Sequence, residues 1–224
     1  MKILLLRRIR HKSTSLLAGQ PPTRVKVERK FSSPGKSVEI LNELRSLDTA
    51  CLCDAYKSFL IRRNRKGIAH QENEGLRLLE SKLRPINTGN RTTMVGVART
   101  IQCTKPNDFL AVLRGLCEAE IDDVLVVNSL SSSRALAGEL FCSEAKRKGV
   151  RGFLIDGPIR DTANLQYSEV RCFATSVSPY SGTIQFVGSM QQVVQCGGHE
   201  VRPGDIVVGD DDGVIVASAS YFYR

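Results

Sequence analysis

The sequence predicts a single α/β domain whose second half is rich in strands. Between Met94 and Ile155, short apolar or alternating runs take turns with helical patterns, and such β-α-β-α-β alternation implies parallel strands with right-handed crossovers. After Asp161 the helical patterns give way to short β segments. At 224 residues the chain can form one well-cored domain and is short for two.

The first elements are expected to be helical. Ser37 can cap a helix whose apolar residues recur at helical spacing up to Leu47, and Asp48 or Thr49 can cap a second helix through Leu60. A polar connection over residues 62–71 then precedes a third expected helix, whose apolar side chains are Leu76, Leu79 and Leu83.

The alternating region follows. A strand is expected over Met94–Cys103, and Asn107 is expected to cap a helix through Leu116. The remaining expected elements are a buried strand at 124–127, a helix at 138–149, a buried strand at 153–155, and short strands at 172–175, 184–187, 193–196, 206–208 and 214–217. Turns are predicted at 203–205 and 209–213.

The net charge of +9 is concentrated in a leader. Residues 1–30 hold nine Lys or Arg against the single acid Glu28, so the rest of the chain is nearly neutral, which argues against nucleic acid as a partner. The leader, residues 1–35, has the composition of an organelle transit peptide or of a disordered basic tail, and residues 36–224 form the domain. A transit peptide would direct the protein to mitochondria or another organelle, and otherwise a cytoplasmic location is expected. No stretch is long and apolar enough to predict a membrane span.

Seven scattered cysteines, without a secretory signal, indicate a reducing compartment and structural thiols. No nucleophile elbow, P-loop or dinucleotide fingerprint is present, and every lysine has charged or polar neighbours, so carbonyl chemistry would have to use a metal ion. The triplet Asp210–Asp212 lacks the spacing of a calcium loop and fits a hairpin turn.

The candidate site combines a strand end and a helix start. The run Phe153–Ile155 is expected to stop at Gly157-Pro158, which puts the adjacent pair Arg160 and Asp161 at the carboxyl end of a strand, where ligands collect in α/β sheets. The helix expected at 138–149 offers free amides at its start, which attract anions. Mg²⁺ takes only one or two carboxylates, so Asp161 alone is sufficient in principle. The alternatives are a surface ion pair, a helix cap by Asp161, and a first-turn acid of no further role at Glu139.

The motifs in this order resemble the RraA-like family, which includes class II 4-hydroxy-4-methyl-2-oxoglutarate aldolases and the regulator of ribonuclease activity A. The resemblance covers roughly residues 37–217. The motifs that carry it are Leu47–Ala55, Leu83–Ile86, Met94–Ala98, Asp122–Val127, Gly138–Leu140, Ile155–Asp161, Phe173–Ala174, Val177–Pro179 and Val201–Val208. An acid followed, after a fixed gap, by Arg-Asp is the aldolase signature, and Glu139 with Arg160 has that gap.

The resemblance implies an α/β/α swivelling-type domain with a mixed sheet, assembled as a homotrimer or hexamer. It implies that Arg160 and the amides of Gly138, Glu139, Leu140 and Phe141 bind a small 2-oxo acid, that Asp161 anchors Mg²⁺ or Mn²⁺, and that Glu139 holds a proton-relaying water. The expected function is metal-dependent cleavage of 4-hydroxy-2-oxo acids to pyruvate, with oxaloacetate decarboxylation as a side activity. The alternative is a non-catalytic regulator that binds a ribonuclease or another protein.

Overall fold

The computed structural model describes residues 34–66, 75–89 and 91–222. Most of the predicted leader, and the end of the polar connection expected at 62–71, therefore lie outside the described residues. The helix α2 (Pro34–Leu44) begins at Pro34, inside the predicted leader and three residues before the predicted cap Ser37. Within the described residues, no helix is both long enough and apolar enough to cross a membrane.

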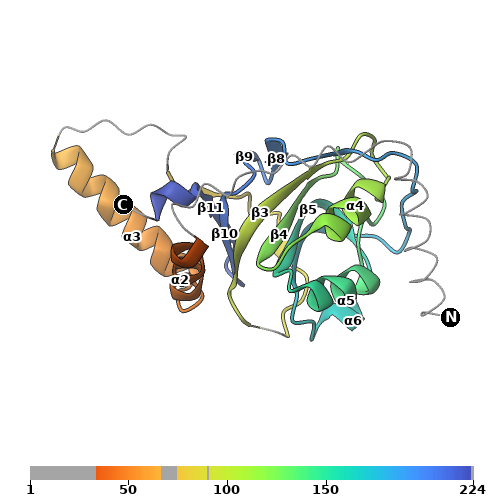
Figure 1. The fold of residues 1–224 in the computed structure, drawn as a ribbon, viewed down its shortest axis with the longest axis horizontal. Helices are drawn as coiled ribbons and strands as arrows, with labels where there is room; N and C mark the ends of the chain where they lie inside the picture. Colours follow the sequence, from red (N-terminus) through yellow and green to blue (C-terminus); the bar gives the residue numbers. More distant parts are fainter. Residues whose placement is uncertain (1–33, 67–74, 90, 223–224) are drawn as a thin grey trace.

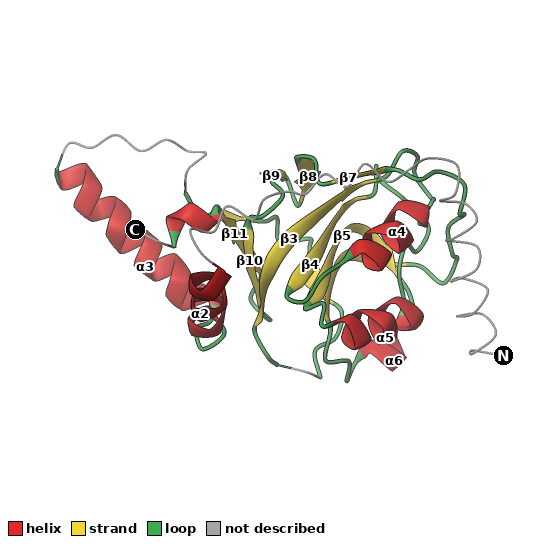
Figure 2. Ribbon diagram, viewed as in Figure 1, coloured by secondary structure: helices red, strands yellow, loops and turns green. Residues whose placement is uncertain are grey.

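A large mixed sheet organises the described part of the chain (Figures 1 and 2). Its centre is parallel, in the order β3 (Met94–Gln102), β4 (Asp123–Asn128), β5 (Gly152–Ile159) and β6 (Arg171–Val177). Antiparallel strands extend both edges: β10 (Ile206–Gly209), β11 (Val214–Ala217) and β1 (Arg77–Leu78) beyond β3, and β2 (Arg84–Pro85) beyond β6. The predicted α/β class with a β-rich second half is confirmed.

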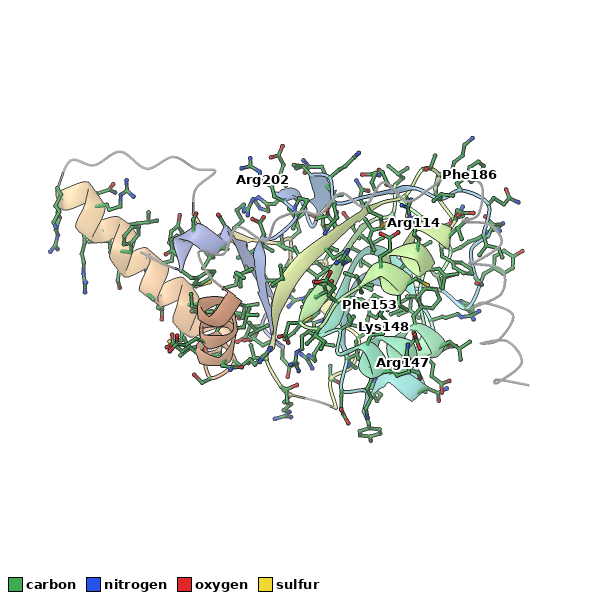
Figure 3. All side chains as sticks on the ribbon, viewed as in Figure 1. Arg114, Arg147, Lys148, Phe153, Phe186 and Arg202 are labelled. Carbon is green, nitrogen blue, oxygen red and sulfur yellow. The ribbon has the colours of Figure 1, made fainter. Side chains whose placement is uncertain are left out.

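The central strands carry apolar side chains on both faces of the sheet. Parallel sheets need this pattern because both of their faces are covered. On one face, α4 (Leu110–Glu118), α5 (Glu139–Lys148) and the one-turn α6 (Thr162–Leu165) cover a core that includes Leu125 and Phe153 (Figure 3). The other face packs against the hairpin of β8 (Val194–Cys196) and β9 (His199–Val201) and against the 79–83 segment.

The second helix confirms one of the two predicted caps. Asp48 accepts a hydrogen bond from the amide of Cys51 at 2.6 Å, and α3 (Thr49–Arg65) runs five residues beyond the expected end at Leu60. Its first turns and α2 pack on the antiparallel flank of the sheet, where Leu41, Leu44 and Ile215 are buried. Figure 1 shows the far end of α3 projecting away from the sheet. Its aromatic side chains meet the final 3₁₀ turn (Ala219–Tyr221), with Tyr56 and Phe59 edge-on to Tyr221.

The helix expected around Leu76, Leu79 and Leu83 is wrong. Residues 77–78 and 84–85 pair with opposite edges of the sheet as β1 and β2, so the helical spacing of these leucines is coincidental. Leu79 and Leu83 both bury against the sheet face that the β8–β9 hairpin covers. Sheet pairing and burial override a weak local preference here.

The strand expected at 184–187 is also wrong. Residues 178–192 form a strap that crosses the carboxyl ends of the parallel strands and reaches β7 (Ser189–Met190), which pairs with β3. Along the way Ser178 bonds to Ile159, Ser181 bridges Ala135 and Thr183 bridges Asp108. The buried Asp108 carboxylate accepts from the amides of Gln185 and Phe186 and from the Thr183 hydroxyl, so side-chain bonds take the place of a neighbouring strand.

The prediction that Asn107 caps α4 is wrong. Its backbone is left-handed (φ 63°), and the amide of Leu110 bonds instead to the Asp108 carboxylate at 3.1 Å. The Asn107 side chain points to the serine loop at 129–133, where its Oδ1 accepts from the amides of Ser133 and Arg134. A residue predicted to start a helix therefore organises the loop that leads towards α5.

Candidate functional site

The predicted site residues lie at the carboxyl end of β5, but the strand ends later than expected. Pairing with β6 shifts register between Ile155 and Pro158, and this irregularity lets the strand pass Gly157 and continue to Ile159. Arg160 is therefore the first residue beyond the strand. The expectation that the strand stops at Gly157-Pro158 is wrong because the bulge accommodates proline without breaking the pairing.

Two backbone hydrogen bonds bring the start of α5 against this strand end. The amide of Leu136 donates to the carbonyl of Pro158, and the amide of Arg160 donates to the carbonyl of Ala137, each at 3.1 Å. Gly138 follows directly and is the N-cap residue of α5. A Cβ at Gly138 would lie 2.5 Å from Asp161 Oδ2 and 2.9 Å from Arg160 Cγ, so only glycine allows these three residues to approach this closely.

Asp161 turns back towards α5. Its left-handed backbone (φ 62°) starts α6, but its side chain makes no capping bond to that helix. Instead, Asp161 Oδ2 accepts the amide of Glu139, the first residue of α5, at 3.1 Å, and lies 3.6 Å from Arg160 Nε. The two side chains are 37% and 36% exposed, which leaves them open to a ligand. Both simple alternatives, an ion pair and a helix cap, thus occur, although the capped helix is α5.

The amides expected to bind an anion divide into two pairs. Glu139 already donates to Asp161, and Phe141 donates to the carbonyl of Gly138 at 3.0 Å. Among the described residues, the amides of Gly138 and Leu140 have no acceptor, so these two remain available. The Phe141 ring is edge-on to Phe109 and packs against the core.

Asn164 is a site residue that the sequence did not reveal. Its Nδ2 donates to Glu139 Oε2 at 2.8 Å, so the carboxylate that begins α5 is held from α6. α5 and α6 are in direct contact, and Figure 1 shows them side by side. An asparagine in a polar stretch carries no spacing signal, and only the fold brings positions 139 and 164 together.

The donor set is compatible with a hard cation completed by water and substrate oxygens. No cluster of three or more His, Cys, Asp or Glu side chains forms among the described residues, but Mg²⁺ needs only one or two carboxylates. Asp161 supplies one that is half-exposed and only partly used by Glu139. The Asp210–Asp212 triplet is engaged elsewhere: Asp210 accepts from Thr49, and Asp211 pairs with the buried Arg171. The amide of Asp210 donates to the carbonyl of Gly213 at 3.0 Å, in keeping with the predicted turn.

A hollow of about 490 Å³ lies away from this site. It is lined by Ala119, Glu120, Ile121, Arg147 and Lys148, at the amino end of β4 and the last turn of α5 (Figure 3). Arg147 bonds to Glu144, and Lys148 bonds to the carbonyl of Cys117, so both cations are already engaged. The candidate residues at the carboxyl end of β5 therefore do not line this hollow.

Comparison with known proteins identifies the family. The family profile RraA-like, described as Aldolase/RraA, matches residues 49–216. The chain belongs to the RraA-like family. A protein of Halalkalibacterium halodurans with the provisional name 4-hydroxy-4-methyl-2-oxoglutarate aldolase is 32% identical over 80% of this chain and 76% of its own.

Solved RraA-like folds agree with this assignment. Streptomyces coelicolor RraAS2, described as an unusual member of the RNase ES inhibitor RraA family, is 28% identical, with a TM-score of 0.64 over 83% of this chain and 87% of its own. A Geobacillus kaustophilus protein described as an S-adenosylmethionine:2-dimethylmenaquinone methyltransferase is 27% identical, with a TM-score of 0.66 over 80% of this chain and 99% of its own. Relatives of this RraA-like chain thus carry names of both enzymes and inhibitors.

Proposed function

We propose that this RraA-like protein is a divalent-metal-dependent aldolase that cleaves 4-hydroxy-2-oxo acids to pyruvate and also decarboxylates oxaloacetate. The observation that supports the proposal is the meeting of a carboxylate, a guanidinium and helix-start amides at the end of β5. Such a set matches the needs of a small oxo acid, which brings a carboxylate and develops negative charge on its carbonyl oxygen. The chain's similarity to a named aldolase supports the same reaction class.

The proposed reaction is a retro-aldol cleavage. The 4-hydroxyl group loses its proton, the C3–C4 bond breaks, and its electron pair moves towards C2 to give the enolate of pyruvate. The former C4 leaves as the carbonyl carbon of the second product, and a proton then returns to C3. Decarboxylation of oxaloacetate releases CO₂ from the corresponding carbon and passes through the same enolate.

Each residue has one part in this proposal. The amides of Gly138 and Leu140 hold the substrate carboxylate at the positive end of the α5 dipole. Arg160 stabilises the oxyanion that develops at C2, and water held by Glu139 moves the protons. Asp161 would hold Mg²⁺ or Mn²⁺, and a cation bound there supplies Lewis-acid polarisation of the 2-oxo group.

The test measures the release of pyruvate from 4-hydroxy-4-methyl-2-oxoglutarate and from oxaloacetate. A coupled dehydrogenase assay detects the pyruvate, and the reactions contain Mg²⁺, Mn²⁺ or EDTA. Arg160→Ala is expected to lower kcat roughly 100- to 1,000-fold, because one oxyanion-stabilising group is lost. Arg151→Ala is the matched control, since Arg151 lies at the opposite end of β5 and pairs with Asp122 at 2.7 Å. It should retain full activity. Turnover that is insensitive to EDTA, or equal in the Arg160→Ala variant, would contradict the proposal.

A second function is favoured by the relatives described as inhibitors of RNA processing and of RNase ES. In this alternative the chain binds a ribonuclease without catalysing a reaction. Binding of a purified RNase E-type endonuclease to the immobilised chain tests it, with the Asp161→Ala variant in parallel. Binding by both proteins, together with absent pyruvate release, would support the regulator. Absent binding would exclude this ribonuclease as its partner.

Assembly is also part of the proposal. By analogy with the family, we expect a homotrimer or hexamer, which light scattering coupled to size-exclusion chromatography can measure. A mass of one chain, at concentrations where activity is observed, would contradict this expectation.

A further inference from the structure

The carboxylate of Glu139 is held from a neighbouring element. Asn164 Nδ2 donates to Glu139 Oε2 at 2.8 Å, while the backbone amide of Glu139 donates to Asp161 Oδ2 at 3.1 Å. The short segment 161–164 therefore fixes Glu139 twice, once by its backbone and once by its side chain. No feature of the local α5 sequence provides the second contact.

The segment that carries Asn164 is itself well fixed. The carbonyl of Asp161 accepts from the amides of Asn164 and Leu165, at 3.0 and 3.1 Å, and Leu165 is 1% exposed within the core beneath α5 and α6. The base of the Asn164 side chain is thus immobilised. Its amide needs only two side-chain torsions to reach Glu139, so little conformational entropy opposes the bond.

The bond is not required to hold α5 in place. Cys142 and Ala145 anchor the helix in the core. At its other end, Lys146 forms an ion pair at 2.7 Å with Glu169, which follows α6. Asn164 therefore orients the Glu139 side chain, whereas other contacts hold α5 in place.

The chemical type of the donor is informative. An ionised carboxylate only accepts hydrogen bonds, and an asparagine amide can satisfy one of its oxygens without adding a charge. A lysine or arginine in this position would hold Glu139 in an ion pair and weaken it as a proton acceptor. The Asn164 bond therefore fixes one carboxylate oxygen of Glu139 without itself adding a charge beside it.

We propose that Asn164 is a positioning residue that holds the Glu139 carboxylate for proton transfer at the β5–α5 site. This inference rests on the proposed aldolase function, in which Glu139 orders the proton-carrying water. A Glu139 side chain that samples several rotamers would order that water only part of the time. Substrate binding, which depends on Arg160 and the α5 amides, would not change.

The experiment is a double-mutant cycle on pyruvate release, with kcat and KM measured for wild type, Asn164→Ala, Glu139→Gln and the double variant. General acid–base groups contribute roughly 100- to 10,000-fold, so loss of positioning alone should lower kcat about tenfold. KM should stay within about twofold, and the Glu139→Gln variant should lose more activity than Asn164→Ala. Because Asn164 acts through Glu139, the double variant should be no slower than Glu139→Gln.

Two further variants separate positioning from structure. Asn164→Asp keeps the size of the side chain but removes the donor and adds a like charge, so it should be at least as slow as Asn164→Ala. Glu169→Ala breaks the ion pair to Lys146 at the opposite end of α5 and should leave kcat unchanged. Circular dichroism melting curves that match the wild type would establish that each variant is folded.

Additive losses in the cycle, or a loss in Glu169→Ala equal to that in Asn164→Ala, would overturn the inference while leaving the aldolase intact. A wild-type chain without metal-dependent pyruvate release would instead remove the proposed function, and the inference with it. The Arg160→Ala variant distinguishes these cases, because its loss of activity establishes that turnover occurs at this site.

Discussion

At the scale of single residues, the conformation of Asp161 decides the character of the site. A left-handed aspartate is tolerated but costs about 1 kcal/mol relative to the usual helical backbone. Here that conformation (φ 62°) turns the side chain away from α6 and towards the first amide of α5. The Asp161 carboxylate therefore occupies the Glu139 amide, which an incoming anion could otherwise bind. It lies next to the amides of Gly138 and Leu140, which remain available.

Gly138→Ala should disrupt the site without unfolding the protein. The new methyl group would lie 2.5 Å from Asp161 Oδ2, so the carboxylate must move, and we expect Mn²⁺ affinity to fall at least about tenfold, or 1.4 kcal/mol. Titration calorimetry measures this change. Gly213→Ala is the matched control, because an added Cβ there would lie 4.0 Å from Leu78 Cδ1, an ordinary van der Waals contact. Equal Mn²⁺ affinity of wild type and Gly138→Ala would contradict the proposed role of Asp161 as a metal ligand.

At the scale of elements, two irregular segments frame the carboxyl end of the sheet together with the start of α5. The strap at 178–192 crosses this end and is fixed by Asp108, while the serine loop at 129–133 is fixed by Asn107. Each of these polar side chains accepts several hydrogen bonds from backbone that has no strand or helix partner of its own. Loops built in this way keep a defined shape because their polar groups are satisfied.

Asn107→Ala should loosen the serine loop. The amide of Ser133 would lose its acceptor, and the amide of Arg134 would keep only its 3.3 Å bond to Ser132 Oγ. A left-handed alanine is also disfavoured, so we expect the free energy of unfolding to fall by about 1–3 kcal/mol. Urea denaturation measures it. Asn107→Asp retains a side-chain oxygen and tolerates the left-handed backbone, and should lose less. An Asn107→Asp variant as unstable as Asn107→Ala would show that the acceptor is not what matters.

At the scale of the whole molecule, the sheet separates two apolar interiors, and the cysteines follow that division. Cys142 and Cys172 meet under α5 with their sulfur atoms 3.2 Å apart, and Cys196 is buried on the opposite face. The hydrogen bond to Cys142 and, to a smaller extent, burial raise the pKa of the Cys172 thiol. Burial raises the pKa of the Cys103 thiol to about 12. Cys51 and Cys117 are exposed.

Thiol labelling should therefore divide the cysteines by burial. A raised pKa favours the unreactive thiol, so at pH 8 only about one Cys103 side chain in ten thousand is a thiolate. We expect Cys51 and Cys117 to react rapidly with iodoacetamide, and Cys103, Cys142, Cys172 and Cys196 to react only after unfolding. Peptide mass spectrometry before and after addition of guanidinium measures this. Rapid labelling of Cys172 in the folded protein would contradict the described core.

The sequence by itself determined the α/β class, the parallel centre of the sheet, the bounds of α5 and the candidate residues at the end of β5. These features follow from local signals: apolar periodicity, a first-turn acid, and a glycine that ends the helix at φ 73°. Only the tertiary structure decided that residues 77–78 and 84–85 pair with opposite sheet edges, that Asn107 serves a loop, and that Asn164 reaches Glu139. Each of these depends on partners roughly 25 to 140 residues away in the chain, which no local pattern encodes.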